Sequence, residues 1–563
     1  MNMRIEPHAL SGRVDGLIAS KSQAHRALIC AALADAPTRI ICNSSSQDVA
    51  ATVRCLEALG ARVEWRYDGM LMMPIGYAVQ SGRGDYDGAC AASVSAIDAA
   101  SAMANANVID TANVSAIDAT DVRPNVNSSD EAINTPSPIT AAALINSADV
   151  QRAPVSAPLL DCGESGSTLR FMLPLAGALG RECAFTGQGK LPKRPLSPMY
   201  EQLAAHGMRM SAQGSFPLTC AGQLTPGRYE IAGNISSQFI TGLLMALPLL
   251  AGDSELRVIG HLESRPYVDI TLDVLKKFGI AIEQHAQGFI IPGGQRFKSP
   301  VSMRIEGDWS SAAFWLAAGA LGENDALGVP CELSDAVSTS DERDADVNRG
   351  APCEPSDTAI ELGNSYVSDA HCKPSDPAST SDERAADAKR CVTCAPLDPE
   401  SAQGDRAIAD ILRRFGARIE CIGDAVLARP AQLSGIALDA SDIPDLVPII
   451  AVVAGASFGD TVISGVSRLR LKESDRICSV LALLDSLGVS AEESDGVLTV
   501  HGRGRLEGGT VDSFGDHRIV MAAAVAGSVA RAPVTISGAQ VSDKSYPGFF
   551  DIFAALGGRA VEV

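Results

Sequence analysis

Residues 56–64 read LEALGARVE, which is the pattern of a helix end, a glycine cap and the first residues of a strand. Gly60 stands at the cap, where glycine tolerates the left-handed conformation that other residues resist. The residues after it alternate between apolar and charged side chains, as a half-buried strand does. Six phrases of this form occur along the chain: Leu56 to Gly60, Leu203 to Gly207, Leu275 to Gly279, Leu412 to Gly416, Leu484 to Gly488 and Phe553 to Gly557.

The spacing of the six glycines predicts a fold built from one repeated unit. They lie 147, 72, 137, 72 and 69 residues apart, so three gaps are near seventy and two are nearly double. Self-similarity at a fixed period is typical of repeat architectures, and this period suits a subdomain with two helices and several strands. Such phrases are also common in any α/β protein, but the near-constant spacing would then be a separate accident.

Two low-complexity segments account for the long gaps: residues 84–158 and 331–402. The first repeats VSAIDA at 94–99 and at 114–119, and the second also repeats a six-residue phrase. Segments with so little apolar surface cannot offset the entropy cost of ordering, so we expect two mobile surface inserts between repeated units. About 415 residues remain outside them, enough for two large domains of three units each.

The acidity of the chain belongs mostly to these inserts. The formal net charge is −21, of which residues 84–158 carry −7 and residues 331–402 carry −10. The remainder is close to neutral, so the low isoelectric point does not exclude an anionic ligand. The charge balance does argue against nonspecific nucleic-acid binding, and we expect no nucleic-acid partner.

The sequence predicts neither a secretory signal nor a membrane partner. The N-terminus lacks the apolar segment of a signal peptide, and the longest apolar stretch, residues 239–251, is too short to span a bilayer. Fourteen scattered cysteines fit a reducing cytoplasm, which we expect as the location. Cys391 and Cys394 form a CxxC pair, for which a zinc site is the alternative to reduced thiols in a loop. No second close pair accompanies it, and we expect no metal.

Cationic and small polar residues recur at the beginnings of predicted helices. One helix is expected from Ser22, as N-cap, to about Ala34, with Lys21 just before it and Arg26 one turn in. Free N–H groups, a hydroxyl and two cations at a helix start suit a phosphate or a carboxylate. The structural alternative is that both cations are simply solvated.

A glycine- and hydroxyl-rich turn around Gly166 leads into a second predicted helix, residues 169–179. Small residues let backbone amides approach an anion, although the turn is not a Walker loop and a plain tight turn is the alternative. Two prolines then stiffen the segment around Arg194. Rigid flanks suit an arginine that holds a carboxylate in bidentate geometry.

Three further helix starts repeat this theme. Residues 236–238 are polar and precede a predicted helix at 239–250, which they could either cap or equip with ligand contacts. Ser264 lies in a polar loop before a helix, and Asp516-His517-Arg518 heads an apolar helix at 519–529. Helix N-termini directed toward one cleft would together favour a ligand with several negative charges.

The segment around Glu473 carries six ionisable side chains between Arg468 and Arg476. On a helix, Lys472 and Arg476 would share a face, although mutual neutralisation is the alternative. Asp445 precedes an apolar helix, where N-capping is the structural alternative to a catalytic role and is compatible with it.

Eight of these motifs occur in the order in which they appear in the 5-enolpyruvylshikimate-3-phosphate (EPSP) synthase family of enolpyruvyl transferases, and the chain resembles that family outside the two inserts. The matching residues are Lys21-Ser22 with Arg26, Gly166 with Arg170, Leu-Pro-Lys-Arg194-Pro, Ser236-Ser237-Gln238, Ser264-Arg-Pro-Tyr267, Ile-Pro-Asp445, Lys472-Glu473-Ser-Asp-Arg476 and Asp-His517-Arg518.

The resemblance implies an α/β fold of two domains, each with three βαβαββ units. One domain would comprise residues 21–306, with the insert at about 84–158. The other would comprise residues 1–20 together with 307–563, with the insert at about 331–402. The chain would cross between the domains near Ser20 and again near Glu306.

The resemblance also implies a reaction: transfer of the enolpyruvyl group of phosphoenolpyruvate to the 5-hydroxyl of shikimate 3-phosphate, with release of phosphate. Asp445 then resembles the base for the hydroxyl, and Glu473 and Lys21 resemble the proton-handling pair. The family resemblance implies no cofactor and no metal, and we expect a monomer.

The implied contacts fall into two shells. The shikimate 3-phosphate shell is Lys21, Ser22, Arg26, Ser236, Ser237, Gln238, Ser264, Asp445 and Lys472. The phosphoenolpyruvate shell is Lys21, Gly166, Arg194, Gln238, Arg476, Arg518 and Lys544.

The chain departs from the family pattern at Arg468, where many relatives have asparagine, so that contact is not carried over. Gly166 leaves room that a larger residue would fill, which by resemblance suggests susceptibility to glyphosate. Two alternatives stay open. A sister transferase acting on a UDP-sugar typically uses a loop cysteine as acid, but the loop around Arg194 has none. A non-catalytic anion-binding scaffold is disfavoured by the intact Lys21, Asp445 and Glu473.

Overall fold

The computed structural model describes residues 1–43, 46–77, 157–322 and 391–563. The described part of the chain forms six four-stranded sheets. The predicted insert at 84–158 lies almost wholly outside the described residues, and so does most of the one at 331–402. None of the described helices is long and apolar enough to cross a membrane.

One unit illustrates all six. Strand β10 (Arg228–Ala232) leads through helix α6 (Ser237–Ala246) and the short helix η2 (Leu247–Leu249) to the parallel strand β11 (Ser254–Ile259). Helix α7 (Arg265–Lys277) follows, and then the antiparallel hairpin of β12 (Glu283–His285) and β13 (Gly288–Ile291). The sheet order is β10-β11-β13-β12, which is a βαβαββ unit.

Two more units accompany this one. The first has β14 (Ser302–Arg304), α1 (Lys21–Leu33), β3 (Thr38–Ile41), α2 (Gln47–Ala58), β4 (Arg62–Arg66) and β5 (Gly69–Met73). The second has β6 (Leu159–Asp161), α4 (Gly166–Ala178), β7 (Cys183–Thr186), η1 (Leu191–Lys193), α5 (Met199–Ala205), β8 (Arg209–Met210) and β9 (Leu218–Ala221).

The remaining three units gather around the C-terminal half. One has β2 (Gly12–Asp15), α8 (Trp309–Leu321), β15 (Val392–Ala395), η4 (Gly404–Ala407), α10 (Ile408–Phe415), β16 (Arg418–Ile422) and β17 (Ala425–Arg429). The next has β18 (Ala437–Asp439), α11 (Val447–Ala456), β19 (Phe458–Ser464), η5 (Ser467–Leu471), α12 (Arg476–Ser486), β20 (Ser490–Ser494) and β21 (Val497–Arg503). The last has β22 (Gly509–Asp512), α13 (His517–Val529), β23 (Val534–Ser537), η6 (Ala539–Lys544), α14 (Phe549–Ala555), β24 (Arg559–Glu562) and β1 (Asn2–Glu6).

The predicted glycine caps are confirmed. All six glycines have positive φ: 104° at Gly60, 103° at Gly207, 75° at Gly279, 110° at Gly416, 72° at Gly488 and 90° at Gly557. The strand after each of them, β4, β8, β12, β16, β20 or β24, is the edge strand of its own sheet. The six phrases therefore mark one equivalent place in six copies of the unit.

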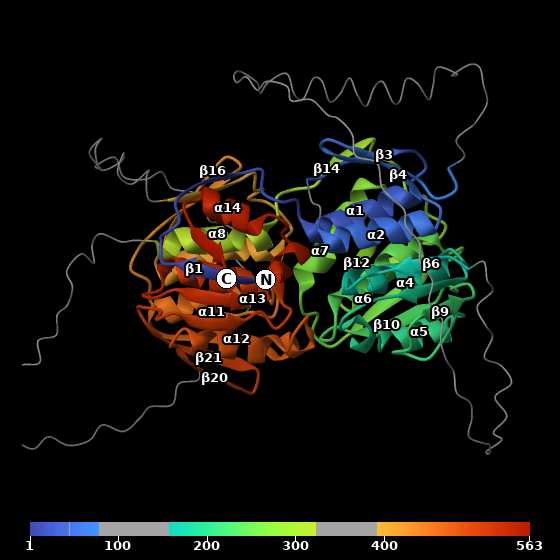
Figure 1. The fold of residues 1–563 in the computed structure, drawn as a ribbon. Coiled ribbons are helices and arrows are strands. Elements are labelled where there is room, and N and C mark those ends of the chain that lie inside the picture. Colours follow the sequence, from blue (N-terminus) through green and yellow to red (C-terminus); the bar gives the residue numbers. More distant parts are fainter. Residues whose placement is uncertain (44–45, 78–156, 323–390) are drawn as a thin grey trace, which may run out of the picture.

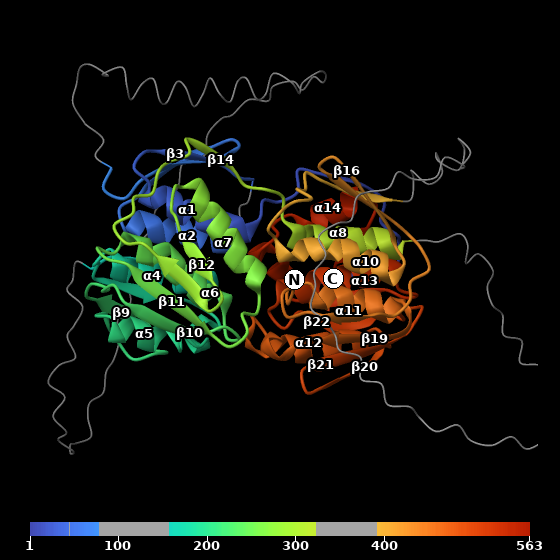
Figure 2. The ribbon, with the colours of Figure 1, turned by 180° about the vertical axis from the view of Figure 1, so that it is seen from behind.

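Buried apolar residues form two separate clusters, and the molecule has two lobes (Figures 1 and 2). The first lobe has its core between Ala19 and Ile305. The core of the second lobe runs from Met3 to Ile18 and resumes at Trp309. Accordingly β1 and β2 join sheets of the second lobe, while β14 completes a sheet of the first.

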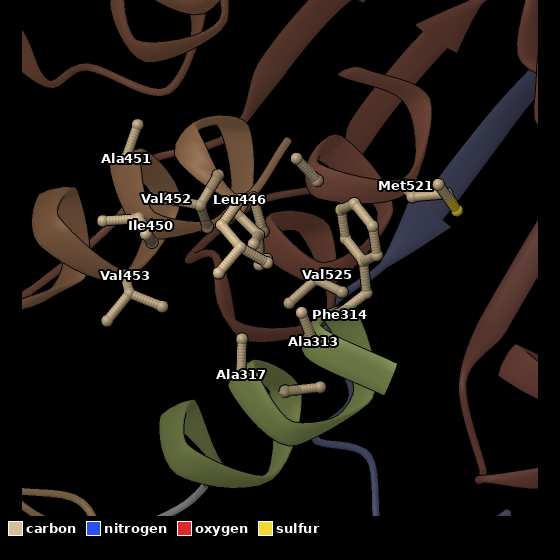
Figure 3. Close-up of a cluster of buried hydrophobic side chains, with 14 of the residues drawn as sticks. Ala313, Phe314, Ala317, Leu446, Ile450, Ala451, Val452, Val453, Met521 and Val525 are labelled. Atoms are coloured by element: carbon tan, nitrogen blue, oxygen red, sulfur yellow. The ribbon is translucent and has the colours of Figure 1, made fainter. Parts of the chain in front are cut away.

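The first helix of each unit is almost wholly buried. In the second lobe α8, α11 and α13 pack together, with Phe314, Ile450 and Val525 in the shared core (Figure 3). A helix that is apolar on all sides is buried in a protein core, so only its ends can reach polar groups or solvent. The inner helices therefore direct their ends, rather than their sides, toward polar surroundings.

The predicted end of the second insert, at residue 402, is wrong. Residues 392–395 form β15, which lies between β2 and β17 in its sheet, and Cys394 is fully buried there. In the sequence this strand could not be distinguished from the insert before it, because β2, one of the two strands with which it pairs, lies far away in the chain. Cys394 thus belongs to a strand and Cys391 directly precedes it, and both are buried. Among the described residues, no group of three or more His, Cys, Asp or Glu side chains could hold a metal ion.

Candidate active site

A cavity of about 1040 Å³, open solvent at its mouth included, is lined by residues of both lobes. Thirteen of the fifteen residues predicted from the sequence lie on its wall: Lys21, Ser22, Arg26, Gly166, Arg194, Ser236, Ser237, Gln238, Ser264, Asp445, Lys472, Glu473 and Lys544. The other two, Arg476 and Arg518, lie behind the wall and contact Asp445.

The inner helices bring these residues together. Helices α1, α4 and α6 of the first lobe begin at the cavity, with Lys21, Gly166 and Ser237 as their first residues. Asp445 lies two residues before α11 of the second lobe. Because several helix N-termini meet here, their dipoles add to the positive potential of the side chains.

Asp445 is the centre of a cluster of cations. Its carboxylate accepts hydrogen bonds from Arg476 (Nη1–Oδ1 2.7 Å) and Arg518 (Nη2–Oδ2 3.1 Å), and Lys472 Nζ lies 3.4 Å from Oδ1. Tyr267, from the other lobe, donates its hydroxyl to Oδ2 at 3.0 Å. Burial alone would raise the pKa of this carboxyl, but the three cations outweigh burial and hold the pKa well below its ordinary value.

Glu473 has a similar setting. Arg476 donates to it at 2.8 Å (Nη2–Oε2) and is itself fully buried against Asp516. Burial opposes ionisation of Glu473, yet Arg476 and Arg194 outweigh burial and hold its pKa well below the ordinary value. The buried cation thus ties two of the predicted catalytic carboxylates, Glu473 and Asp445, to one guanidinium.

Lys21 stands at the start of α1 and donates to Asp48 at 3.0 Å (Nζ–Oδ2). Burial alone would lower the pKa of Lys21, but Asp48 and Glu473 outweigh burial and raise the pKa above its ordinary value. Lys21 therefore stays a cation at neutral pH. In this state it can bind an anion but cannot accept a proton.

Arg194 lies directly over Gly166. A Cβ atom added at Gly166 would come within 2.4 Å of Nη1 and 2.8 Å of Cζ of Arg194. The absence of a side chain at position 166 therefore lets the guanidinium rest on the N-terminus of α4. Beside it, Arg170 donates to Gln238 at 2.6 Å (Nη1–Oε1) and links α4 to α6.

The sequence model of EPSP synthase (3-phosphoshikimate 1-carboxyvinyltransferase) matches residues 5–104, 139–330 and 375–553. The chain belongs to the EPSP synthase family. A 3-phosphoshikimate 1-carboxyvinyltransferase from Clostridium kluyveri is 33% identical over 560 residues, which cover 99% of this chain and 98% of that protein. Another from Clostridium novyi is 37% identical over 401 residues, covering 71% of this chain and 77% of that protein.

Solved structures of enolpyruvyl transferases have the same fold. EPSP synthase from Acinetobacter baumannii superposes with a TM-score of 0.64 at 18% identity and covers 100% of both chains. The enolpyruvyl transferase NikO from Streptomyces tendae has a TM-score of 0.61 at 15% identity, covering 100% of this chain and 98% of that chain. The predicted fold class, with six units in two lobes, is confirmed.

Two local predictions about this EPSP synthase family member are wrong, and one structural alternative does not hold. Ser20, not Ser22, caps α1 by accepting from Gln23 N. Lys472 and Arg476 do not share a helix, because Asp475 caps α12 and leaves Lys472 in extended backbone between η5 and α12. Asp445 caps no helix, since α11 begins after Leu446 without a side-chain cap.

Asp48, Glu164, Arg170 and Tyr267 are among the cavity residues that were not assigned a role from the sequence. Asp48 follows the N-cap Ser46 in the first turn of α2, where an acidic residue is ordinary, so nothing distinguishes it. Glu164 accepts from Lys544 at 2.8 Å across the lobes, over 380 residues of sequence. Arg170 and Tyr267 stand inside the recognised motifs, and that position was the signal that could have identified them.

Proposed function

We infer that this protein transfers the enolpyruvyl group of phosphoenolpyruvate to the 5-hydroxyl of shikimate 3-phosphate and releases phosphate, the EPSP synthase reaction of the shikimate pathway. The family match and relatives of that name over nearly the whole chain support this activity. The observation that carries it is the cavity between the lobes, where carboxylates stand among cations from both lobes. Such a cavity suits two phosphorylated acids.

We propose that Asp445 accepts the proton of the 5-hydroxyl while that oxygen attacks C2 of phosphoenolpyruvate. Glu473, acting with Lys21, delivers a proton to the methylene carbon, which becomes a methyl group. The tetrahedral intermediate then loses one methyl proton and its phosphate group, which restores the carbon–carbon double bond. Proton transfer to and from positioned carboxyl groups is ordinary general acid–base catalysis.

The negative charge of the bound substrates would raise the pKa values of both carboxyl groups. Without ligand, the surrounding cations keep the pKa values of Asp445 and Glu473 low. Two phosphorylated substrates would place negative charge beside the same cations and offset their effect. Both pKa values should then rise, which favours proton exchange only after the substrates have bound.

The proposed contacts are residues that line the cavity, together with Arg476 and Arg518 behind its wall. For shikimate 3-phosphate they are Lys21, Ser22, Arg26, Ser236, Ser237, Gln238, Ser264, Asp445 and Lys472. For phosphoenolpyruvate they are Lys21, Gly166, Arg194, Gln238, Arg476, Arg518 and Lys544.

We also propose that the two lobes are the two domains, residues 21–306 and residues 1–20 with 307–563. Strand exchange at β1, β2 and β14 and the separate cores support these boundaries. A monomer in the cytoplasm is the further proposal. Eight of the ten described cysteines are buried and none of the ten forms a disulfide, which suits a reducing compartment.

The UDP-sugar alternative is not favoured, because the described residues that line the cavity include no cysteine. Phosphate release separates the candidates. Purified protein should release phosphate only when shikimate 3-phosphate and phosphoenolpyruvate are both present. Release with a UDP-sugar in place of shikimate 3-phosphate would support the sister reaction, and binding of both ligands without release would support a scaffold.

A further inference from the structure

The beginning of α7 is in contact with the second lobe. Ser264 N donates to Ser441 O at 3.2 Å, and Arg265 N donates to Asp442 Oδ1 at 3.0 Å. Together with the bond from Tyr267 to Asp445, these contacts join the start of α7 to the second lobe. Closure of the cavity on this side therefore depends on a few polar bonds.

Arg468 adds an arginine side chain to these contacts. It lies on η5 of the second lobe, reaches the first lobe, and pairs with Glu263 (Nε–Oε2 3.0 Å). It also donates through Nη2 to Ser264 Oγ. Its side chain is 11% exposed and that of Glu263 is 24% exposed, so the pair is shielded from solvent. A shielded ion pair is weakened little by salt.

Ser264 needs such support. Its backbone is left-handed, with φ 55° and ψ 40°, and its side chain caps no amide of α7. A serine in this conformation is strained and keeps it only where its surroundings hold it. The surroundings that hold Ser264 are Arg468 and Ser441, and both belong to the second lobe. With the lobes apart, Ser264 would lose both contacts.

We propose that Arg468 is a positioning residue: by binding Glu263 and Ser264 across the lobes, it holds Ser264 in the conformation that lines the cavity and so couples lobe closure to the binding of shikimate 3-phosphate. This inference rests on the proposed function. Arg468 then acts on the ligand indirectly, through Ser264 and Glu263. A direct contact between Arg468 and the ligand would not need Glu263.

The test is calorimetric binding of shikimate 3-phosphate to the full chain and to four variants: Arg468→Met, Arg468→Lys, Glu263→Gln and the double variant Arg468→Met/Glu263→Gln. Loss of a charged hydrogen bond should raise Kd about tenfold for Arg468→Met and for Glu263→Gln. The double variant should bind shikimate 3-phosphate no less tightly than the single variant with the higher Kd, because both changes break the same ion pair. Arg468→Lys keeps the charge beside Glu263 and should fall between wild type and Arg468→Met.

Arg470→Met is the matched control. Arg470 lies on the same short helix but pairs with Asp475 and Glu493 within its own lobe, and it is 43% exposed. This variant should bind shikimate 3-phosphate as the wild type does. The KM for phosphoenolpyruvate at saturating shikimate 3-phosphate should change less than about twofold in all variants, because the bond lost acts on the other substrate.

Two results would overturn the inference. If Glu263→Gln binds like the wild type while Arg468→Met weakens binding, Arg468 acts on the ligand directly. If all variants bind like the wild type, the bridge has no role in binding. Thermal unfolding identifies a variant that fails to fold. If Arg468→Met fails to fold, the two single variants Glu263→Gln and Arg468→Lys carry the test. A wild-type protein that does not bind shikimate 3-phosphate would instead remove the proposed function.

Discussion

Gly166→Ala should weaken phosphoenolpyruvate binding and leave shikimate 3-phosphate binding intact. The new Cβ would stand 2.4 Å from Nη1, 2.8 Å from Cζ and 3.2 Å from Nη2 of Arg194. Ordinary contact needs about 3.5 Å, so the guanidinium must move by about 1 Å. Its Nε has no hydrogen-bond partner among the described residues, so the side chain can yield without breaking a bond of that atom.

The magnitude follows from the loss of one charged contact. A charged hydrogen bond contributes about 1.5–3 kcal/mol, which corresponds to about 10- to 150-fold in affinity. Displacement by about 1 Å should remove most of it, so kcat/KM for phosphoenolpyruvate should fall by about that factor. The melting temperature should change little, because Arg194 moves and the backbone of α4 does not.

Steady-state phosphate release at saturating shikimate 3-phosphate measures kcat/KM for phosphoenolpyruvate, and calorimetry measures Kd for shikimate 3-phosphate. Gly322→Ala is the control, because a Cβ at Gly322 would meet its nearest atom at 3.6 Å. Its φ of −56° also suits alanine. An unchanged kcat/KM in Gly166→Ala, or an equal loss for both substrates, would refute the assignment of Arg194 and Gly166 to phosphoenolpyruvate.

Four other predictions concern the site, acid stability and the first insert. Arg194→Ala should impair phosphoenolpyruvate capture far more than shikimate 3-phosphate binding, and equal losses in calorimetry would contradict this. Asp445→Asn should lower kcat by about 10²- to 10⁴-fold in phosphate release, because the base is lost; near-normal turnover would exclude that role. Burial lowers the pKa of His25 to about 3, so between pH 6.5 and 3 the unfolded chain binds the extra proton and stability falls as pH falls. Urea unfolding at pH 6.5 and pH 5 should therefore show His25→Gln losing about 2 kcal/mol less than wild type, and an equal loss would disprove it. Deletion of residues 90–155 should leave a soluble protein with a cooperative melt, because the described residues supply all six sheets; aggregation would show that the segment is needed for folding.

Helix ends, unlike contacts between lobes, could be predicted from the sequence. Gly60 and its five counterparts mark helix caps because the left-handed conformation is a local demand that glycine meets best. Short motifs also placed most cavity residues, since α1, α4 and α6 carry such residues in their first turns and Asp445 lies two residues before α11. The pattern around Lys472 predicted a helix that would include both Lys472 and Arg476, and this was wrong. The side chain of Asp475 caps the helix instead, so α12 begins at Arg476, four residues after Lys472.

The sequence by itself determined the six repeated units, the family and the set of polar residues available for chemistry, because caps, periodicity and motif order are properties of neighbours in the chain. Only the tertiary structure decided which of these residues meet. Asp48 beside Lys21, Glu164 beside Lys544 and Arg468 beside Glu263 are pairs formed by the packing of inner helices and the approach of two lobes. No local pattern encodes them, since each pair depends on how separate elements or cores are placed relative to one another.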